Sequence, residues 1–186
     1  MRRIRQYGER VASVGWGLSI YHPHPEYYPT LSPLIREIKT PVVIDHFGGL
    51  KTASLLKFMG IDTKDFDPKT QPGMDAICSM LTDGCLWIKL SAPYRVSEDP
   101  TYQDMEPIVR TLVNANPDRV LYGSDWPHTS AFHRRPKDMK GTDVETYLDF
   151  DDLAWVKTLK EWLSESEWQK LMIDNPRAFL GYNAKD

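Results

Sequence analysis

Reactive side chains follow the short apolar runs of this 186-residue sequence. His22 and His24 come after the first run, His46 after the second, and Asp125 after the fourth, with His128 three residues further on. A carboxylate can take a proton from water, and an imidazole can polarise a carbonyl group or bind a metal ion. These residue types at these positions predict acid–base or metal-assisted chemistry.

The third apolar run ends in "LSAPYR", which supplies Ser91, Tyr94 and Arg95. The planar guanidinium of an arginine can donate two parallel hydrogen bonds to a carboxylate, and a tyrosine adds a phenol. The motif predicts a small acidic substrate. Three structural alternatives stay open from the residues alone: a surface salt bridge for Arg95, a helix cap or turn for Asp125, and a simple strand-end hydrogen bond for His46.

His22 and His24 belong to the segment "HPHP". In extended chain, side chains two residues apart lie on the same face, and the prolines at 23 and 25 favour that conformation. The spacing leaves three interpretations: a contact with the substrate, a structural turn, or a metal site.

The elements that must position these residues alternate along the chain. The apolar runs at 15–21, 41–46, 85–91 and 119–125 are typical of buried parallel strands. Alternating strands and helices indicate an α/β fold, in which ligands bind at the carboxyl ends of the strands. The helical patterns lie at 1–15, 27–39, 73–84 and 101–116.

Two segments follow the fourth strand. Residues 129–152 form a polar stretch that is too long for an ordinary connection, so we expect a lid or a flexible loop. Residues 153–182 are predicted to form closing helices: Ser164 has capping-box spacing to Glu167, and the dipeptide at 175–176 is expected to end one helix.

Composition narrows the class of protein. The length and 41% apolar content predict a single domain over residues 1–186. A net charge of -3 without a large basic cluster argues against nucleic-acid or anionic-membrane partners. The sequence has no continuous apolar segment of the length that would predict a membrane span. Cys78 and Cys85 are expected to be buried free thiols, which favours a cytoplasmic location.

Four motifs, taken in order, carry a family resemblance. The sequence from about residue 5 to 182 resembles the carboxyl-terminal part of the second family of amidohydrolase-related proteins, and within it the 2-pyrone-4,6-dicarboxylate lactonase-like hydrolases. The motifs are "VVIDHFGG", "LWIKLSAPYR", "PDRVLYGSDWPH" and "IDNPRAFLGY".

The resemblance implies a (β/α)8 TIM-type barrel with its active site at the carboxyl ends of the strands. It assigns His46 to the substrate carbonyl or a metal ion, Arg95 to a substrate carboxylate, and Asp125 to the activation of water. Tyr94 and His128 match motif positions near the ligand.

The sequence departs from this family in one large respect: it contains four clear strands where a full barrel has eight. We therefore expect only the carboxyl-terminal half to two-thirds of the barrel, and His22 and His24 cannot be the family's first-strand histidine pair. Four strands would leave two unpaired edges and an exposed apolar interior. We expect a fragment or incomplete gene product, in preference to a homodimer that closes a barrel.

These expectations converge on a hydrolase for a small carboxylated ester such as a lactone, without a cofactor. Asp125 would activate water, His46 would polarise the carbonyl, and Arg95 would hold a carboxylate, with Ser91, Tyr94, His128, His22 and His24 as further substrate contacts. One alternative is a metal-dependent decarboxylase or amidohydrolase with a zinc or manganese ion on His46 and Asp125. Another is an inactive remnant with a binding or oligomer role.

Overall fold

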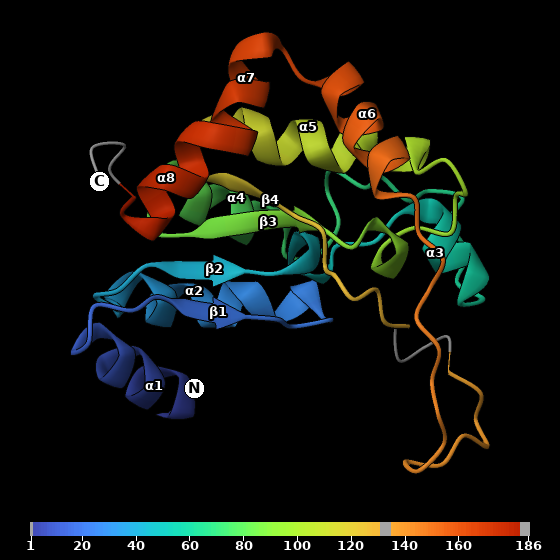
Figure 1. Ribbon diagram of the computed structural model, residues 1–186, viewed down its shortest axis with the longest axis horizontal. Helices are drawn as coiled ribbons and strands as arrows, with labels where there is room; N and C mark the ends of the chain where they lie inside the picture. Colours follow the sequence, from blue (N-terminus) through green and yellow to red (C-terminus); the bar gives the residue numbers. More distant parts are fainter. Residues whose placement is uncertain (1, 131–134, 183–186) are drawn as a thin grey trace.

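The computed structural model describes residues 2–130 and 135–182, which form a parallel sheet of four strands in the order β1-β2-β3-β4. Each strand lies inside its predicted range, so the α/β expectation is confirmed (Figure 1). The two edges of the sheet are β1 and β4. The bounds are β1 (Leu18–Ile20), β2 (Val42–Ile44), β3 (Trp87–Ser91) and β4 (Val120–Gly123).

Helices cover one face of this sheet. Outward side chains of the strands, such as Ile44, Ile88 and Val120, pack with Ile35 and Leu112 into one core in which none of these residues is more than 1% exposed. Burial of such a side chain contributes roughly 1.5–3 kcal/mol. The described helices are α1 (Arg2–Ala12), α2 (Tyr28–Glu37), α3 (Ala53–Phe58), α4 (Met74–Thr82), α5 (Glu106–Ala115), α6 (Asp152–Trp162), α7 (Glu165–Gln169) and α8 (Asn175–Leu180). Of these, α8 packs on the opposite face through Phe179.

The opposite, inner face of the sheet changes character along the strands. Near the amino ends, Val43, Trp87 and Leu121 are 2–6% exposed and pack with Phe179 of α8, whose ring centroid lies 5.3 Å from that of Trp87. Because side chains alternate along a strand, the same face continues from Trp87 to the polar Lys89. The expected exposed apolar interior is therefore wrong for these residues: a helix covers them, and polar side chains follow.

Several local expectations differ from the structure. Helix α3 was not predicted. The chain stays helical through 175–176, because a π-helical turn at Lys170–Asp174 leads into α8 and Pro176 occupies its first turn, where no intrahelical N–H bond is lost. Cys78 and Cys85 are free thiols but only partly buried.

One helix start behaves as predicted. Ser164 and Glu167 form a capping box at α7, and Gly181 ends α8 in the left-handed conformation that favours glycine. The described part of 129–151 contains neither helix nor strand, as expected of a loop, and its role as a lid stays a prediction.

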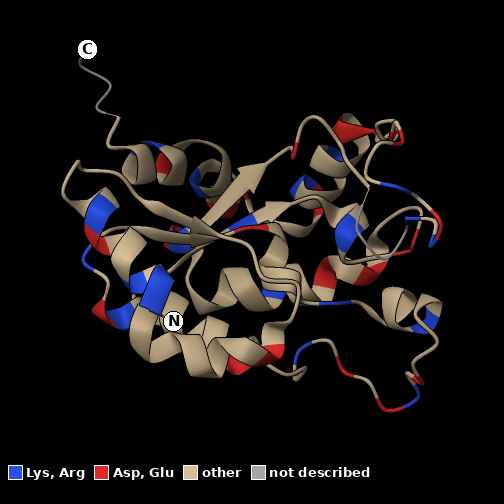
Figure 2. Cartoon of the chain, turned by 90° about the horizontal axis from the view of Figure 1, so that it is seen from below, with Lys and Arg blue, Asp and Glu red and all other residues tan. Residues whose placement is uncertain are grey.

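Lys and Arg residues are interspersed with Asp and Glu residues along the chain (Figure 2). Among the described residues, none of the helices combines the length and apolar character needed to cross a membrane.

Candidate active site

The chain leaves three strands through residues in the left-handed region of backbone space. His46 after β2, Ala92 after β3 and Asp125 after β4 have φ values of 52°, 52° and 64°. Such a conformation costs a non-glycine residue about 1–3 kcal/mol and persists where the surrounding structure enforces it, commonly at functional sites. The strain lies at the carboxyl edge of the sheet, where the fold class places ligands.

His46 and Asp125 form the centre of this edge. The distance from His46 Nε2 to Asp125 Oδ1 is 3.5 Å, and the two side chains are 15% and 19% exposed. Both line a cavity of about 220 Å³ that also contacts Lys89 and Ser91. The structure thus brings the two predicted catalytic residues together from separate strands.

The imidazole of His46 is held from its other nitrogen. Nδ1 lies 2.9 Å from Ser91 Oγ, and the Tyr21 ring packs edge-on at 5.0 Å between centroids. Burial lowers the pKa of His46, and the negative charge of Asp125 only partly offsets this effect. A neutral ring that accepts from the Ser91 hydroxyl at Nδ1 carries its proton on Nε2, and it can donate that proton to an oxygen in the cavity.

Two donors fix the carboxylate of Asp125. The Tyr94 hydroxyl donates to Oδ2 at 2.6 Å, and Arg95 Nε donates to the same oxygen at 3.0 Å. Burial, followed by the hydrogen bond to Asp125, raises the pKa of Tyr94, so the phenol stays a neutral donor. With Oδ2 occupied, Oδ1 is the oxygen that faces His46.

Arg95, predicted to bind a substrate carboxylate, contacts the carboxylate of Asp125 in the structure. It bridges Asp125 to Thr129 Oγ1, which accepts from Nη2 at 2.9 Å. Among the contacts within 2–130 and 135–182, Nη1 has no hydrogen bond, but Arg95 does not contribute to the lining of the 220 Å³ cavity, so its binding of a substrate carboxylate stays a prediction.

Tyr94 and His128, predicted as substrate contacts, lie behind Asp125. They are 3% and 7% exposed, and neither contributes to the lining of the 220 Å³ cavity. His128 pairs through Nε2 with Asp152 Oδ2 at 2.9 Å, and the Phe150 ring packs against both aromatic groups.

Sequence reasoning missed Lys89 and Asp152. Lys89 lies on the same strand face as Ser91, two residues before it, and its Nζ is 2.7 Å from Asp45 Oδ1 inside the cavity lining. The period of two could have indicated Lys89. Asp152 arrives from the far end of the 129–152 stretch, and spacing gives no signal for it.

His22 and His24 form a separate cluster. The His24 backbone N–H donates to His22 Nδ1 at 3.2 Å, and both rings pack against Tyr27 at 5.1 and 6.2 Å between centroids. Neither histidine contributes to the lining of the cavity at His46. These contacts match the structural-turn interpretation, and a substrate contact stays a prediction.

His46 and Asp125 are also the predicted ligands of a metal ion. Across the described ranges, no group of three His, Cys, Asp or Glu side chains is placed to hold a metal ion. His46 and Asp125 supply two donors to the cavity, and Arg95 already contacts the same carboxylate, whereas a catalytic zinc uses three protein ligands. These residues alone do not fit a metal ion.

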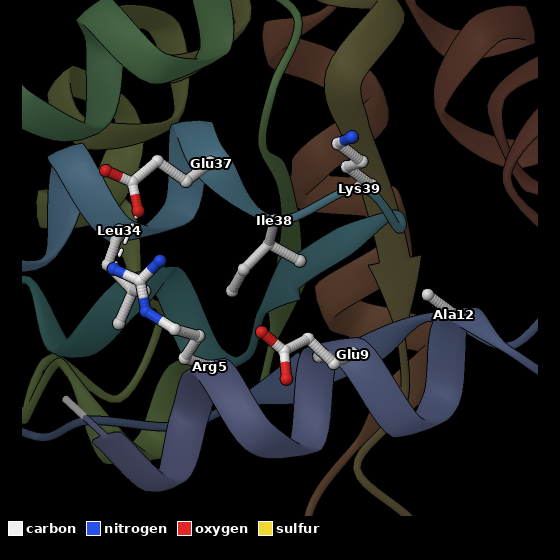
Figure 3. A pocket seen from close by; sticks show the side chains of 8 residues that line it. Arg5, Glu9, Ala12, Leu34, Glu37, Ile38 and Lys39 are labelled. Atoms are coloured by element: carbon white, nitrogen blue, oxygen red, sulfur yellow. Dashed lines mark ion pairs between the residues drawn. The ribbon is translucent and has the colours of Figure 1, made fainter.

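A second cavity, of about 350 Å³, lies between α1 and α2 (Figure 3). Arg5 Nη2 and Glu37 Oε2 form an exposed ion pair of 2.7 Å across it. Helix α1 approaches closely because Gly8 lacks a side chain: a Cβ there would lie 3.1 Å from Ile38. None of the predicted site residues lines this cavity.

Known proteins share the sequence pattern of this chain. Residues 9–182 match the family described as Amidohydrolase. The chain is 30% identical over 157 residues to a 4-sulfomuconolactone hydrolase of Hydrogenophaga intermedia, covering 84% of this chain and 44% of that protein. It is 29% identical over 182 residues to a 2-pyrone-4,6-dicarboxylate hydrolase of Comamonas testosteroni, covering 93% and 51%.

Solved structures share the fold. A putative 2-pyrone-4,6-dicarboxylic acid hydrolase from Pseudomonas putida aligns with a TM-score of 0.62 at 22% identity, over 97% of this chain and 56% of that one. An amidohydrolase from Burkholderia multivorans with bound zinc also aligns at 0.62, with 12% identity, over 95% and 56%. The chain spans about half the length of the relatives it matches, which confirms the expected partial barrel. This chain belongs to the amidohydrolase family.

Proposed function

We propose that the cavity at the carboxyl ends of β2, β3 and β4 hydrolyses a lactone that carries an acidic group. The observation that carries the proposal is the pair of His46 Nε2 and Asp125 Oδ1, 3.5 Å apart on one cavity wall. A donor and a proton acceptor at this separation can act on a carbonyl oxygen and on an attacking water, respectively.

The chemistry follows from the two groups. The Nε2–H of His46 donates to the lactone carbonyl oxygen, while Asp125 Oδ1 takes a proton from water. The water oxygen forms a bond to the carbonyl carbon and gives a tetrahedral intermediate. The negative oxygen of this intermediate accepts a hydrogen bond from His46 Nε2–H. Collapse breaks the ring C–O bond, and the protonated Asp125 returns its proton to the leaving oxygen. Lactone and water thus become a hydroxy acid.

Positive charge beside the pair supports an acidic substrate. Lys89 lines the cavity with its Nζ 2.7 Å from Asp45 Oδ1, and Arg95 Nε donates to Asp125 at 3.0 Å, so a cationic group accompanies each carboxylate of the lining. The names of two relatives, 4-sulfomuconolactone hydrolase and 2-pyrone-4,6-dicarboxylate hydrolase, combine a lactone or pyrone ring with acidic groups. This agreement supports the same class of substrate here.

The test compares two lactones that differ only in one group, a ring carboxylate in the first and its methyl ester in the second. We expect the purified protein to open the acid at least about tenfold faster than the ester, because a desolvated charge pair discriminates by more than 1 kcal/mol. The Lys89→Gln variant should reduce that ratio. If the protein opens neither ring, the proposal is overturned. If it opens both at equal rates, the proposed preference for an acidic substrate is wrong.

A further inference from the structure

A row of four side chains, Asp125, Tyr94, His128 and Asp152, runs from the cavity to the first turn of α6. The Tyr94 hydroxyl donates to Asp125 Oδ2 at 2.6 Å and lies 3.4 Å from His128 Nδ1. His128 Nε2 in turn lies 2.9 Å from Asp152 Oδ2. These residues come from the turn after β3, the segment after β4 and the start of α6, so the contacts depend on the tertiary fold.

The middle of this row is closed off by Phe150. Its ring centroid lies 5.0 Å from that of Tyr94 and 4.9 Å from that of His128. The Leu148 backbone N–H also donates to the His128 carbonyl oxygen at 2.8 Å, which holds the returning chain over the pair. Tyr94 and His128 are therefore placed to act on Asp125 and not on a substrate in the cavity.

Asp152 determines which nitrogen of His128 carries the proton. An ionised carboxylate only accepts hydrogen bonds, so the neutral ring must place its proton on Nε2. Nδ1 is then an acceptor that faces the Tyr94 hydroxyl. Asp152 can do this because its neighbour Asp151 caps the helix, accepting from Ala154 N–H at 2.9 Å.

The hydroxyl of Tyr94 has one proton and two acceptors. While Asp125 is ionised, the shorter, charge-assisted bond to Oδ2 holds that proton. Once Asp125 Oδ1 has taken a proton from water, the carboxylate loses its charge and the bond from the Tyr94 hydroxyl to Oδ2 weakens, so the Tyr94 proton can turn to another acceptor. His128 Nδ1 is in place for it.

We propose that His128 and Asp152 are positioning residues: Asp152 fixes His128 with Nδ1 as an acceptor, so that the Tyr94 hydroxyl can turn to it when Asp125 becomes protonated. The proposal rests on the proposed function for the protonation of Asp125. The fixed form of the His128 ring does not rest on it.

The first test is a nitrogen-15 NMR spectrum of the histidine rings in the chain, with His128→Gln to assign the signals. We expect the Nε2–H form of His128 in the wild type and in Asp151→Asn, a matched control in which asparagine still caps α6. In Asp152→Asn, whose amide can donate as well as accept, the Nδ1–H form should appear. A wild-type ring in the Nδ1–H form, or a ring unaffected by Asp152→Asn, would overturn the proposal.

The second test is kinetic. Asp152→Asn should lower kcat about tenfold with little change in KM, as removal of a partner that orients a site residue does. Asp152→Glu should restore part of this loss, and Asp151→Asn should leave the rate unchanged. In a Tyr94→Phe background Asp152→Asn should have no further effect, because the partner it acts through is gone.

The two tests fail separately. A wild-type protein that opens no lactone would contradict the proposed function, and the NMR spectra would still decide how His128 is held. An Asp152→Asn loss that persists in full in the Tyr94→Phe background would contradict the positioning role even in an active enzyme.

Discussion

The two histidine regions of this molecule differ in how they are built. His22 and His24 are two residues apart, and their partners are their own turn and Tyr27. His46 and Asp125 are 79 positions apart in the sequence, yet they share a cavity wall and are both mostly buried. The closely spaced pair has the appearance of a site in the sequence, and the distant pair has the geometry of one.

The difference has a physical origin. Spacing along one strand fixes only which side chains share a face. A reactive pair needs groups from different strands, whose approach depends on the register of the sheet and on the turns that follow. Here those turns are left-handed at His46 and Asp125, so local strain accompanies the convergence.

The two regions meet at Gly49, which offers the strongest way to disturb both. Its φ is 74°, and a Cβ there would lie 2.6 Å from the His22 carbonyl oxygen. We expect Gly49→Ala to lower the free energy of unfolding by at least about 2 kcal/mol, from backbone strain and overlap together. Urea unfolding measures the change.

Gly60→Ala is the matched control, because Gly60 has a φ of 79° and open space around its missing Cβ. It should cost only the conformational part, about 1 kcal/mol. Equal losses at the two glycines would show that the contact between the regions is unimportant.

Ser91→Ala tests how the His46 ring is oriented in the cavity. The variant removes the hydroxyl 2.9 Å from Nδ1, so the ring can turn away from the cavity. We expect kcat to fall about tenfold, the usual size for loss of an orienting partner, while the urea midpoint changes little. Steady-state kinetics with the carboxylated lactone provide the measurement, and an unchanged kcat would mean that packing alone orients His46.

His24→Gln should have the smallest effect. The side chain of His24 is 59% exposed and faces Tyr27 and Glu26. We expect kcat/KM to change by less than about threefold, as for a surface substitution away from the reacting groups. A loss of tenfold or more in the same assay would instead place this ring in contact with the substrate, as the sequence allowed.

Much of the fold could be predicted because strands and helices have local signals. The four apolar runs predicted the four strands of the sheet, and the capping residues Ser164 and Glu167 correctly predicted the start of α7. The predicted helix end at 175–176 was wrong, because a proline in the first turn of a helix has the same local sequence signal as one that follows a helix end.

The candidate site likewise has a part that could be predicted from the sequence and a part that could not. His46 and Asp125 were predicted from their places at strand ends. Asp152 and Phe150 were not, because the return of a long loop brings them to His128, and no period in the sequence encodes that return. The bond of Arg95 to Asp125 likewise joins separate strand ends and required the folded structure.

The measurement that tests the central claim most directly is the turnover of the carboxylated lactone by Asp125→Asn. Asparagine keeps the shape of the side chain and cannot take a proton from water, so we expect kcat to fall at least about a hundredfold, the usual range for loss of a general base. A kcat within a few-fold of the wild type would contradict the account, because the pair of His46 and Asp125 would then not be the site of the chemistry.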